Sequence, residues 1–204
     1  MKQFKFLSAL CCMVVAVAFS SCLFDDDDDD SNKSLTPTQV SQCFAIVGGD
    51  YQGKLLCYAT ESAKMAEAID SLDITWSIPS DTILVIHQFP AKSLANSITY
   101  APLREALVEQ PDQTLKCYIG FVSTSPIEFL INPWTLTYNV TYDGEEHKVQ
   151  ALFYVYSAYS FGSYDATTQE LTMKIVEGAL YIDGKQSSYL PSDIPIVFKS
   201  GKKK

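Results

Sequence analysis

The stretch from Trp134 to Tyr142 reads WTLTYNVTY and alternates strictly between large, mostly apolar side chains and small polar ones. A period of two puts all the large side chains, Trp134 included, on one face of an extended chain, as in an antiparallel strand with one buried side. Asp143-Gly144 follows and favours the positive φ angles of a tight turn. The chain then returns as a second predicted strand, from His147 to Tyr156. This stretch therefore predicts an antiparallel β-hairpin.

Strands of the same kind recur on both sides of the hairpin. The other predicted strands are Tyr51–Ala59, Ile74–Ile78, Thr82–Phe89, Thr114–Val122, Ile127–Ile131, Glu170–Ile182 and Ile194–Phe198. Turn residues separate most of them, as expected for a meandering antiparallel sheet. A count of roughly eight to ten strands predicts a mainly β (α+β) protein, built as an antiparallel β-barrel or a β-sandwich.

Short helices accompany the predicted strands. Thr36 suits an N-cap and Pro37 the first helical position, so a helix is expected to begin there and to end before Gly48-Gly49. A second helix is predicted from Pro102 to Glu109, and residues 61–70 have an ambiguous, alanine-rich character. Two or three short helices are therefore expected to cover an open end or an edge of the sheet.

The N-terminus has the features of a bacterial lipoprotein signal. Lys2 and Lys5 precede an apolar run from Phe6 to Phe19, which is shorter than the roughly 20 residues that a membrane-spanning helix needs. The small pair Ser20-Ser21 stands directly before Cys22, as in a lipobox. We expect acylated Cys22 to become the mature N-terminus and to hold the protein on a membrane. Plain secretion and a retained signal anchor are the alternatives.

Six aspartates, Asp25–Asp30, follow Cys22 almost at once. Such a block of like charges repels itself and stays solvated, so it is expected to act as a disordered tether. Acidic residues after a lipidated cysteine also resemble the surface-export signal of lipoproteins in Bacteroidetes bacteria. The expected location is the outer membrane, with exposure on the cell surface. The predicted division is a signal peptide at 1–21, a lipidated cysteine and tether at 22–34, and one mainly β domain at 35–204.

The composition limits the classes of function. The 204 residues carry a formal net charge of -9, which does not suit binding to nucleic acid. Hydrophobic residues make up 47% of the chain and aromatic residues 12%, which is ample for a buried core in a single domain.

A resemblance covers nearly the whole mature chain. The signal, the acidic tether, Leu35-Thr36-Pro37, the YQGKL stretch at Tyr51–Leu55 and the IHQFP stretch at Ile86–Pro90 resemble a family of small lipoproteins of gut Bacteroidetes that contain a domain of unknown function. The resemblance implies an envelope lipoprotein and supplies no catalytic residues.

The chain contains no Gly-x-Ser-x-Gly elbow, His-Glu-x-x-His helix or Cys-x-x-Cys pair. No cofactor, metal site or enzymatic activity is therefore expected. His87 is expected in the core, on the strand face of Phe89, and His147 in solvent beside the hairpin turn. Glu128 and Glu177 would form a glycosidase pair only if the fold held them roughly 5 to 10 Å apart.

Three cysteines remain after Cys22, and each falls on the apolar side of its element. Cys43, Cys57 and Cys117 are expected to be free buried thiols, or else Cys43 and Cys57 form one disulfide.

The segment from Tyr154 to Tyr164 reads YVYSAYSFGSY and joins two predicted strands. Tyr, Ser and Gly are favoured in recognition loops, because rigid rings give contact area at a low entropic cost. Tyr156, Tyr159, Phe161 and Tyr164 are therefore candidate ligand-binding residues. The alternative is that these rings cover the open end of the barrel or pack under a neighbouring loop.

These features favour a binding module on the cell surface, with a glycan or a protein as its ligand. A structural or assembly lipoprotein of the envelope is the alternative, and a hydrolase is a more distant one.

Overall fold

The computed structural model describes residues 34–58, 68, 70–156 and 158–200, and Ser34–Lys204 forms one compact unit. The predicted signal peptide, Cys22 and the aspartate run lie outside the described residues. Within the described ranges, no helix is long and apolar enough to span a membrane.

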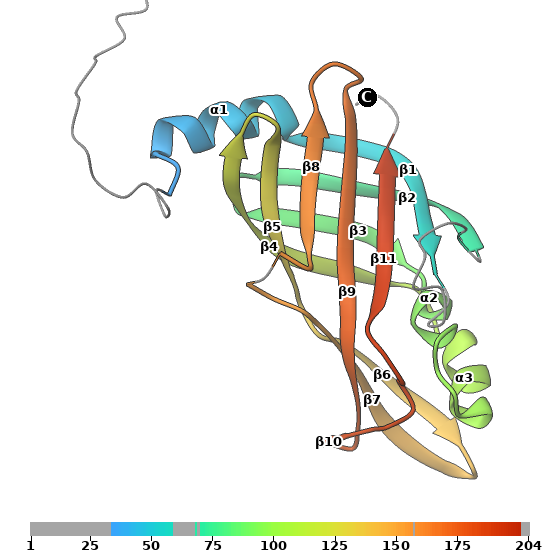
Figure 1. Ribbon diagram of the computed structural model, residues 1–204. Coiled ribbons are helices and arrows are strands. Elements are labelled where there is room, and N and C mark those ends of the chain that lie inside the picture. The colour runs from blue at the N-terminus through green and yellow to red at the C-terminus, as the bar shows by residue number, and fades with distance from the viewer. Residues whose placement is uncertain (1–33, 59–67, 69, 157, 201–204) are drawn as a thin grey trace, which may run out of the picture. The chain divides into compact units, whose positions relative to one another are not determined.

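Eight antiparallel strands of the described chain close into a barrel (Figure 1). In the order of their pairing they are β11 (Ile194–Ser200), β1 (Gly49–Cys57), β2 (Asp70–Ser80), β3 (Ile83–Phe89), β4 (Gln113–Thr124), β5 (Ile127–Pro133), β8 (Phe161–Asp165) and β9 (Glu170–Ile182). Pairing of β9 with β11 closes the ring, with Met173 opposite Phe198. The predicted mainly β fold is confirmed, and the architecture is the barrel rather than the sandwich.

The second half of β9 leaves the barrel and continues into an arm. The arm also contains β6 (Leu136–Tyr142), β7 (Glu145–Phe153) and β10 (Lys185–Gln186). β7 and β8 pair with successive parts of β9. The predicted hairpin is confirmed, because β6 and β7 pair up to Tyr142 and Glu145, and the turn residues Asp143 and Gly144 have φ angles of 51° and 85°.

Trp134 does not belong to this hairpin face, contrary to the sequence-based prediction. Its amide donates a hydrogen bond of 2.9 Å to the carbonyl of Lys116 on β4, so the chain at Trp134 still follows the barrel wall. It therefore continues the outward positions of β5, which are Glu128, Leu130 and Asn132. The arm begins two residues later, at Leu136.

Three helices occur in the described residues. α1 (Pro37–Val47) has the predicted N-cap, because the Thr36 hydroxyl and the Gln39 side chain form a reciprocal capping box. α3 (Ala101–Val108) packs beside β6 of the arm. α2 (Ala91–Ala95) was not predicted, and its side chains are mostly buried.

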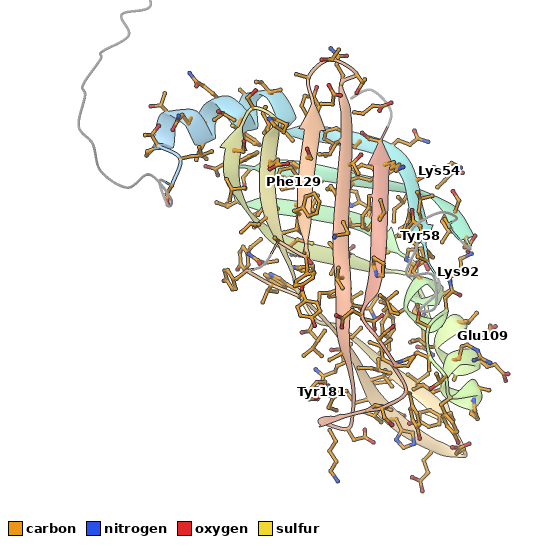
Figure 2. All side chains as sticks on the ribbon, viewed as in Figure 1. Lys54, Tyr58, Lys92, Glu109, Phe129 and Tyr181 are labelled. Carbon is orange, nitrogen blue, oxygen red and sulfur yellow. The ribbon has the colours of Figure 1, made fainter. Side chains whose placement is uncertain are left out.

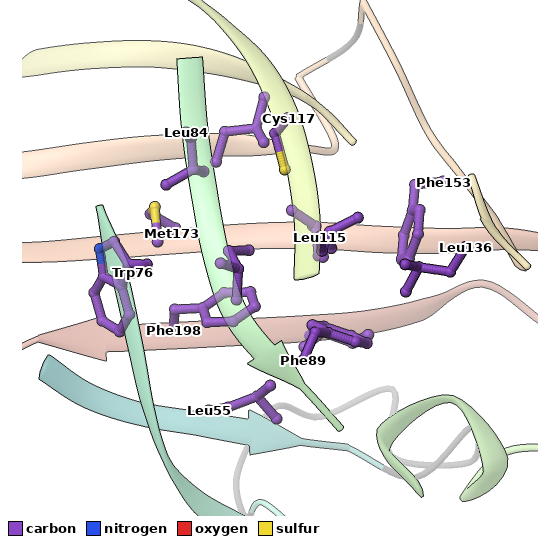
Figure 3. Packing of buried hydrophobic residues seen from close by; sticks show 14 of the residues in the cluster. Leu55, Trp76, Leu84, Phe89, Leu115, Cys117, Leu136, Phe153, Met173 and Phe198 are labelled. Carbon is purple, nitrogen blue, oxygen red and sulfur yellow. The ribbon is translucent and has the colours of Figure 1, made fainter. Parts of the chain in front are cut away.

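Side chains fill the barrel interior (Figure 3). Trp76 stacks on Tyr51 at 5.8 Å between ring centroids and meets Phe198 edge-on at 6.0 Å. Phe89 and Phe129 are likewise fully buried. An eight-stranded barrel is just wide enough to be filled in this way or to hold one small ligand. Because these rings occupy the interior, a ligand would have to bind on the outer surface.

Candidate ligand-binding face

The outer side of β4, β5 and β8 carries a group of large apolar side chains. We call this group the aromatic face: Tyr118, Val122, Leu130, Trp134 and Phe161, with Tyr156 from the loop before β8. Alternation along β4 turns Leu115, Cys117, Ile119 and Phe121 inward and leaves the residues between them outside. Tyr118 and Trp134 remain about half exposed, and their ring centroids lie 5.6 Å apart.

Cross-strand pairing aligns two members of the aromatic face, Leu130 and Phe161, in one row across the sheet. Gly120 on β4 pairs with Leu130 on β5, Leu130 pairs with Phe161 on β8, and Phe161 pairs with Lys174 on β9. No atom lies within 4 Å of where a Gly120 side chain would begin, so this end of the row is open. A shallow groove of about 290 Å³ adjoins it, lined by Val122, Glu128, Phe129, Leu130, Ala158 and Phe161.

On the inner side of this row, β8 packs tightly against β5. A Cβ atom at Gly162, which follows Phe161, would lie 2.3 Å from the ring of Phe129. Figure 2 marks Phe129 among the side chains of the barrel wall. Glycine is therefore required at this position so that β8 can pack on the Phe129 ring.

Tyr156 has an unusual conformation for a bulky residue. Its φ angle is 52°, in the left-handed region, which costs a non-glycine residue roughly 1–2 kcal/mol. Its amide donates a hydrogen bond to Oδ1 of Asn132 on β5. The side chain is 81% exposed. The fold thus holds a strained tyrosine with its ring in solvent, an arrangement typical of functional positions.

The rest of this loop is anchored to the barrel. The Tyr154 amide donates to the Val176 carbonyl at 2.9 Å, and the Tyr154 ring lies against Gly178. At the other end, buried Ser160 accepts hydrogen bonds from Ile131 and from Val176. The loop is therefore fixed at both ends against β5 and β9.

The four aromatic residues proposed from the sequence have different environments. Tyr156 and Tyr159 are exposed, and Tyr159 packs against Tyr154 at 5.2 Å. Phe161 is half-buried in the row. Tyr164 is only 6% exposed and points into the core, so it is not available to a ligand. The reason is that Phe161–Asp165 forms strand β8, whose alternation turns Tyr164 inward.

Tyr118, Asn132 and Trp134 belong to the candidate site, and the sequence reasoning missed them. Within the predicted strand Thr114–Val122, a period of two separates Tyr118 from the apolar positions Cys117 and Ile119, and this signal could have identified it. Nothing in the sequence pattern distinguishes Trp134 from the buried residues of β6, or pairs Asn132 with the Tyr156 amide.

His87 lies on the outer surface, so its expected core position is wrong. Between Ile86 and Phe89 the register of β3 shifts by a bulge, with Gln88 at a φ angle of 51°. The bulge moves Phe89 to the inside and leaves His87 outside, where Nε2 lies 3.2 Å from the Ser77 hydroxyl.

Glu128 and Glu177 lie on opposite sides of the barrel wall and cannot act as a glycosidase pair. Glu128 points outward, and Glu177 is fully buried. Both carboxylate oxygens of Glu177 and the nearby Tyr138 hydroxyl have no hydrogen-bond partner among the described residues. Burial away from water raises the pKa of Glu177 to about 8, so this side chain is mainly neutral at pH 7.

The disulfide between Cys43 and Cys57 is absent, and both residues are free buried thiols, like Cys117. Cys43 lies on α1, next to the Ser123 carbonyl of β4. Cys57 ends β1, a strand whose nine residues span roughly 26 Å. α1 and Cys57 therefore lie at opposite ends of this strand (Figure 1).

The fold defines a closed, side-chain-filled antiparallel β-barrel with an exposed aromatic face. The chain belongs to the family described as a domain of unknown function, DUF4840, whose model matches residues 46–182. This range contains the aromatic face. The expected domain of unknown function is thereby confirmed. No curated protein and no solved structure matches the chain.

Proposed function

We propose that this protein is a binding module on the outer surface of the cell, held there by a lipid on Cys22, and that a glycan or protein ligand docks on the aromatic face. This function needs an exposed recognition surface and a membrane anchor. The aromatic face supports the first requirement, and the N-terminal sequence supports the second.

The conformation of Tyr156 is the observation that carries the proposal. A tyrosine in the left-handed region with a solvated ring destabilises the folded protein slightly, and the hydrogen bond that its amide donates to Asn132 keeps it there. A ligand that buries this ring would account for the strain. A ring already ordered before binding also loses little conformational entropy in the complex.

The position of the other exposed rings supports the same site. Exposed apolar patches on a monomer mark interaction surfaces, and Tyr and Trp are enriched among the residues that dominate binding energy. Tyr118, Trp134 and Tyr156 are both exposed on this surface and of the residue types that dominate binding energy.

The N-terminal sequence supports the anchor. Ser20-Ser21-Cys22 fits acylation, and several acyl chains on one cysteine hold a protein stably at a membrane. The aspartates Asp25–Asp30 provide a solvated spacer and resemble an export signal for the cell surface.

The test is binding of the purified full-length protein to an array of glycans and proteins. Trp134→Ala should weaken the strongest signal by about 2 kcal/mol, which is roughly thirtyfold. The matched control is Tyr181→Ala, on the part of β9 that lies in the arm (Figure 2), and it should bind like the wild type. Equal binding by Trp134→Ala and the wild type would contradict the proposed site.

A further inference from the structure

We infer that the ligand of the aromatic face is a glycan that carries carboxylate groups, of the uronic-acid class, and that Lys116 and Lys174 bind these carboxylates. This inference rests on the proposed function and specifies the ligand of the same site.

Two lysines lie over rings of the aromatic face. Lys116 Nζ is 5.8 Å from the centroid of the Trp134 ring, and Lys174 Nζ is 5.1 Å from that of Phe161. An ammonium group at this distance is attracted by the negative face of the ring. The rings therefore orient both cations beside the surface on which a ligand would stack.

Neither lysine is neutralised by an acidic side chain of the described residues. The ion pairs in that part of the chain are Lys54–Asp73, Lys92–Asp70 and His147–Asp183, all outside the aromatic face. Glu128 lies at the groove and is more than 4 Å from both ammonium groups. In a chain with a net charge of -9, two cations without acidic partners at this face are complementary to an acidic ligand.

The shape and composition of the face favour a sugar over other acidic ligands. The negative faces of aromatic rings attract polarised C–H groups, which line one side of a sugar ring. The open position at Gly120 leaves room for a sugar ring beside Leu130. Glu128, Asn132 and the Tyr118 hydroxyl add hydrogen-bonding groups of the kind that sugar hydroxyls need.

The same features argue against a nucleic acid or a protein. A nucleic acid carries a charge on every phosphate and calls for a continuous row of cations, whereas this face has two lysines and a carboxylate. A stable protein interface buries about 800 Å² on each partner around an apolar centre. Here Gly120, Glu128 and Asn132 interrupt the apolar surface.

The two lysines are far enough apart to require an oligosaccharide. Lys116 lies four residues from Gly120 along β4, and Lys174 lies three strands across from Gly120. Strand rise and strand spacing place the two positions on the order of 20 Å apart. A chain of sugar units can reach both lysines, and a single uronic acid can reach only one.

The test uses polygalacturonate, alginate and hyaluronate, each beside its methyl ester, which keeps the sugar backbone and removes the charge. The full-length protein should bind at least one acid form about tenfold more tightly than its ester, a difference of about 1.4 kcal/mol. Oligomers of that polymer should bind more tightly as they lengthen. Lys116→Gln and Lys174→Gln should each weaken binding severalfold, and the control Lys148→Gln, an exposed position on β7 of the arm, should not.

The outcomes separate this inference from the proposed function. Suppose that an acid polymer and its ester bind equally well and that Trp134→Ala abolishes both. This result would contradict the inference of an acidic ligand and would leave the aromatic face as the binding site. Binding of an acid polymer that Trp134→Ala does not weaken would overturn both. If none of the three acid polymers binds, or if only polyglutamate or single-stranded DNA binds through the two lysines, the uronic-acid inference is wrong.

Discussion

The backbone amide of Tyr156 donates a hydrogen bond to the side-chain carbonyl of Asn132, and this contact joins the loop before β8 to the outer side of β5. The two residues are 24 positions apart in the chain. Asn132 pairs across the sheet with Tyr118, so the contact also brings Tyr156 into the aromatic face. A backbone conformation that is unfavourable for tyrosine is thus maintained by one strand residue.

Asn132→Leu should release this loop. The variant loses the acceptor of the Tyr156 amide, and we expect a loss of about 1 kcal/mol in the free energy of unfolding. Binding should weaken as well, because the Tyr156 ring is no longer held in place. Urea unfolding and proteolysis within residues 154–160 measure the two effects. Asn139→Leu, an exposed position on β6, is the control. Equal loop cleavage in the two variants would show that Asn132 does not order the loop.

Gly120→Val should block the aromatic face without damaging the fold. A side chain here meets no atom within 4 Å, and valine is favoured in strands, so stability should stay within about 1 kcal/mol of the wild type. The branched side chain would occupy the space beside Leu130, and binding should fall at least about tenfold. Thr114→Val, another exposed position on β4, controls for the change in strand propensity. Wild-type affinity in Gly120→Val would remove this position from the site.

Glu177→Gln should change how stability depends on pH. Burial raises the pKa of Glu177 to about 8 in the folded protein, whereas an unfolded chain has a pKa near the ordinary value of about 4.3. The folded state therefore holds a proton that the unfolded state releases as pH rises. Stability should decrease from about pH 4 to pH 8 and change little above this range, and at pH 7 the loss is roughly 4 kcal/mol.

Urea unfolding at pH 5 and pH 8 measures this effect. Glu177→Gln removes the titrating group, so its stability should fall less than that of the wild type between the two pH values. Glu128→Gln, on the outer side of the wall, is the matched control and should follow the wild type. Parallel pH profiles of Glu177→Gln and the wild type would show that Glu177 is not the linked group.

Cys22→Ala should release the protein from membranes, because the proposed anchor is the lipid on this cysteine. Fractionation and labelling with radioactive palmitate test this in the producing cells. The wild type should carry label and pellet with membranes, and Cys43→Ala should behave in the same way. Membrane pelleting of an unlabelled wild type would contradict the lipid anchor.

Local sequence patterns predicted most of the strands but not which strands pair with each other. Alternation and the Asp143-Gly144 pair predicted the β6–β7 hairpin, and Thr36-Pro37 predicted the start of α1. Closure of the barrel depends on β9 pairing with β11, and no local pattern specifies that pairing. The bulge at Gln88 shifts the alternation of inward and outward side chains by one residue, and a simple period of two could not predict this shift.

The site was predictable only in part, for the same reason. The aromatic content of residues 154–164 indicated a recognition loop, and two of its rings are exposed. Tyr164 was assigned to the loop because β8 is short and contains two small residues, Gly162 and Ser163. Trp134 and Tyr156 are placed on the same side of the barrel by the path of the chain after β5 and by the hydrogen bond to Asn132, which are tertiary features.

The most direct test of the aromatic face compares Tyr156→Gly with Tyr156→Phe. Glycine adopts a φ angle of 52° without strain, so Tyr156→Gly should be as stable as the wild type or more stable, by up to about 1 kcal/mol. If the exposed ring binds the ligand, Tyr156→Gly should lose affinity for the strongest array ligand by about tenfold or more, and Tyr156→Phe should retain most of it. Titration calorimetry and thermal unfolding of the three proteins measure both quantities. Loss of affinity with retained stability is the result we predict, and wild-type affinity in Tyr156→Gly would contradict the proposed role of this face.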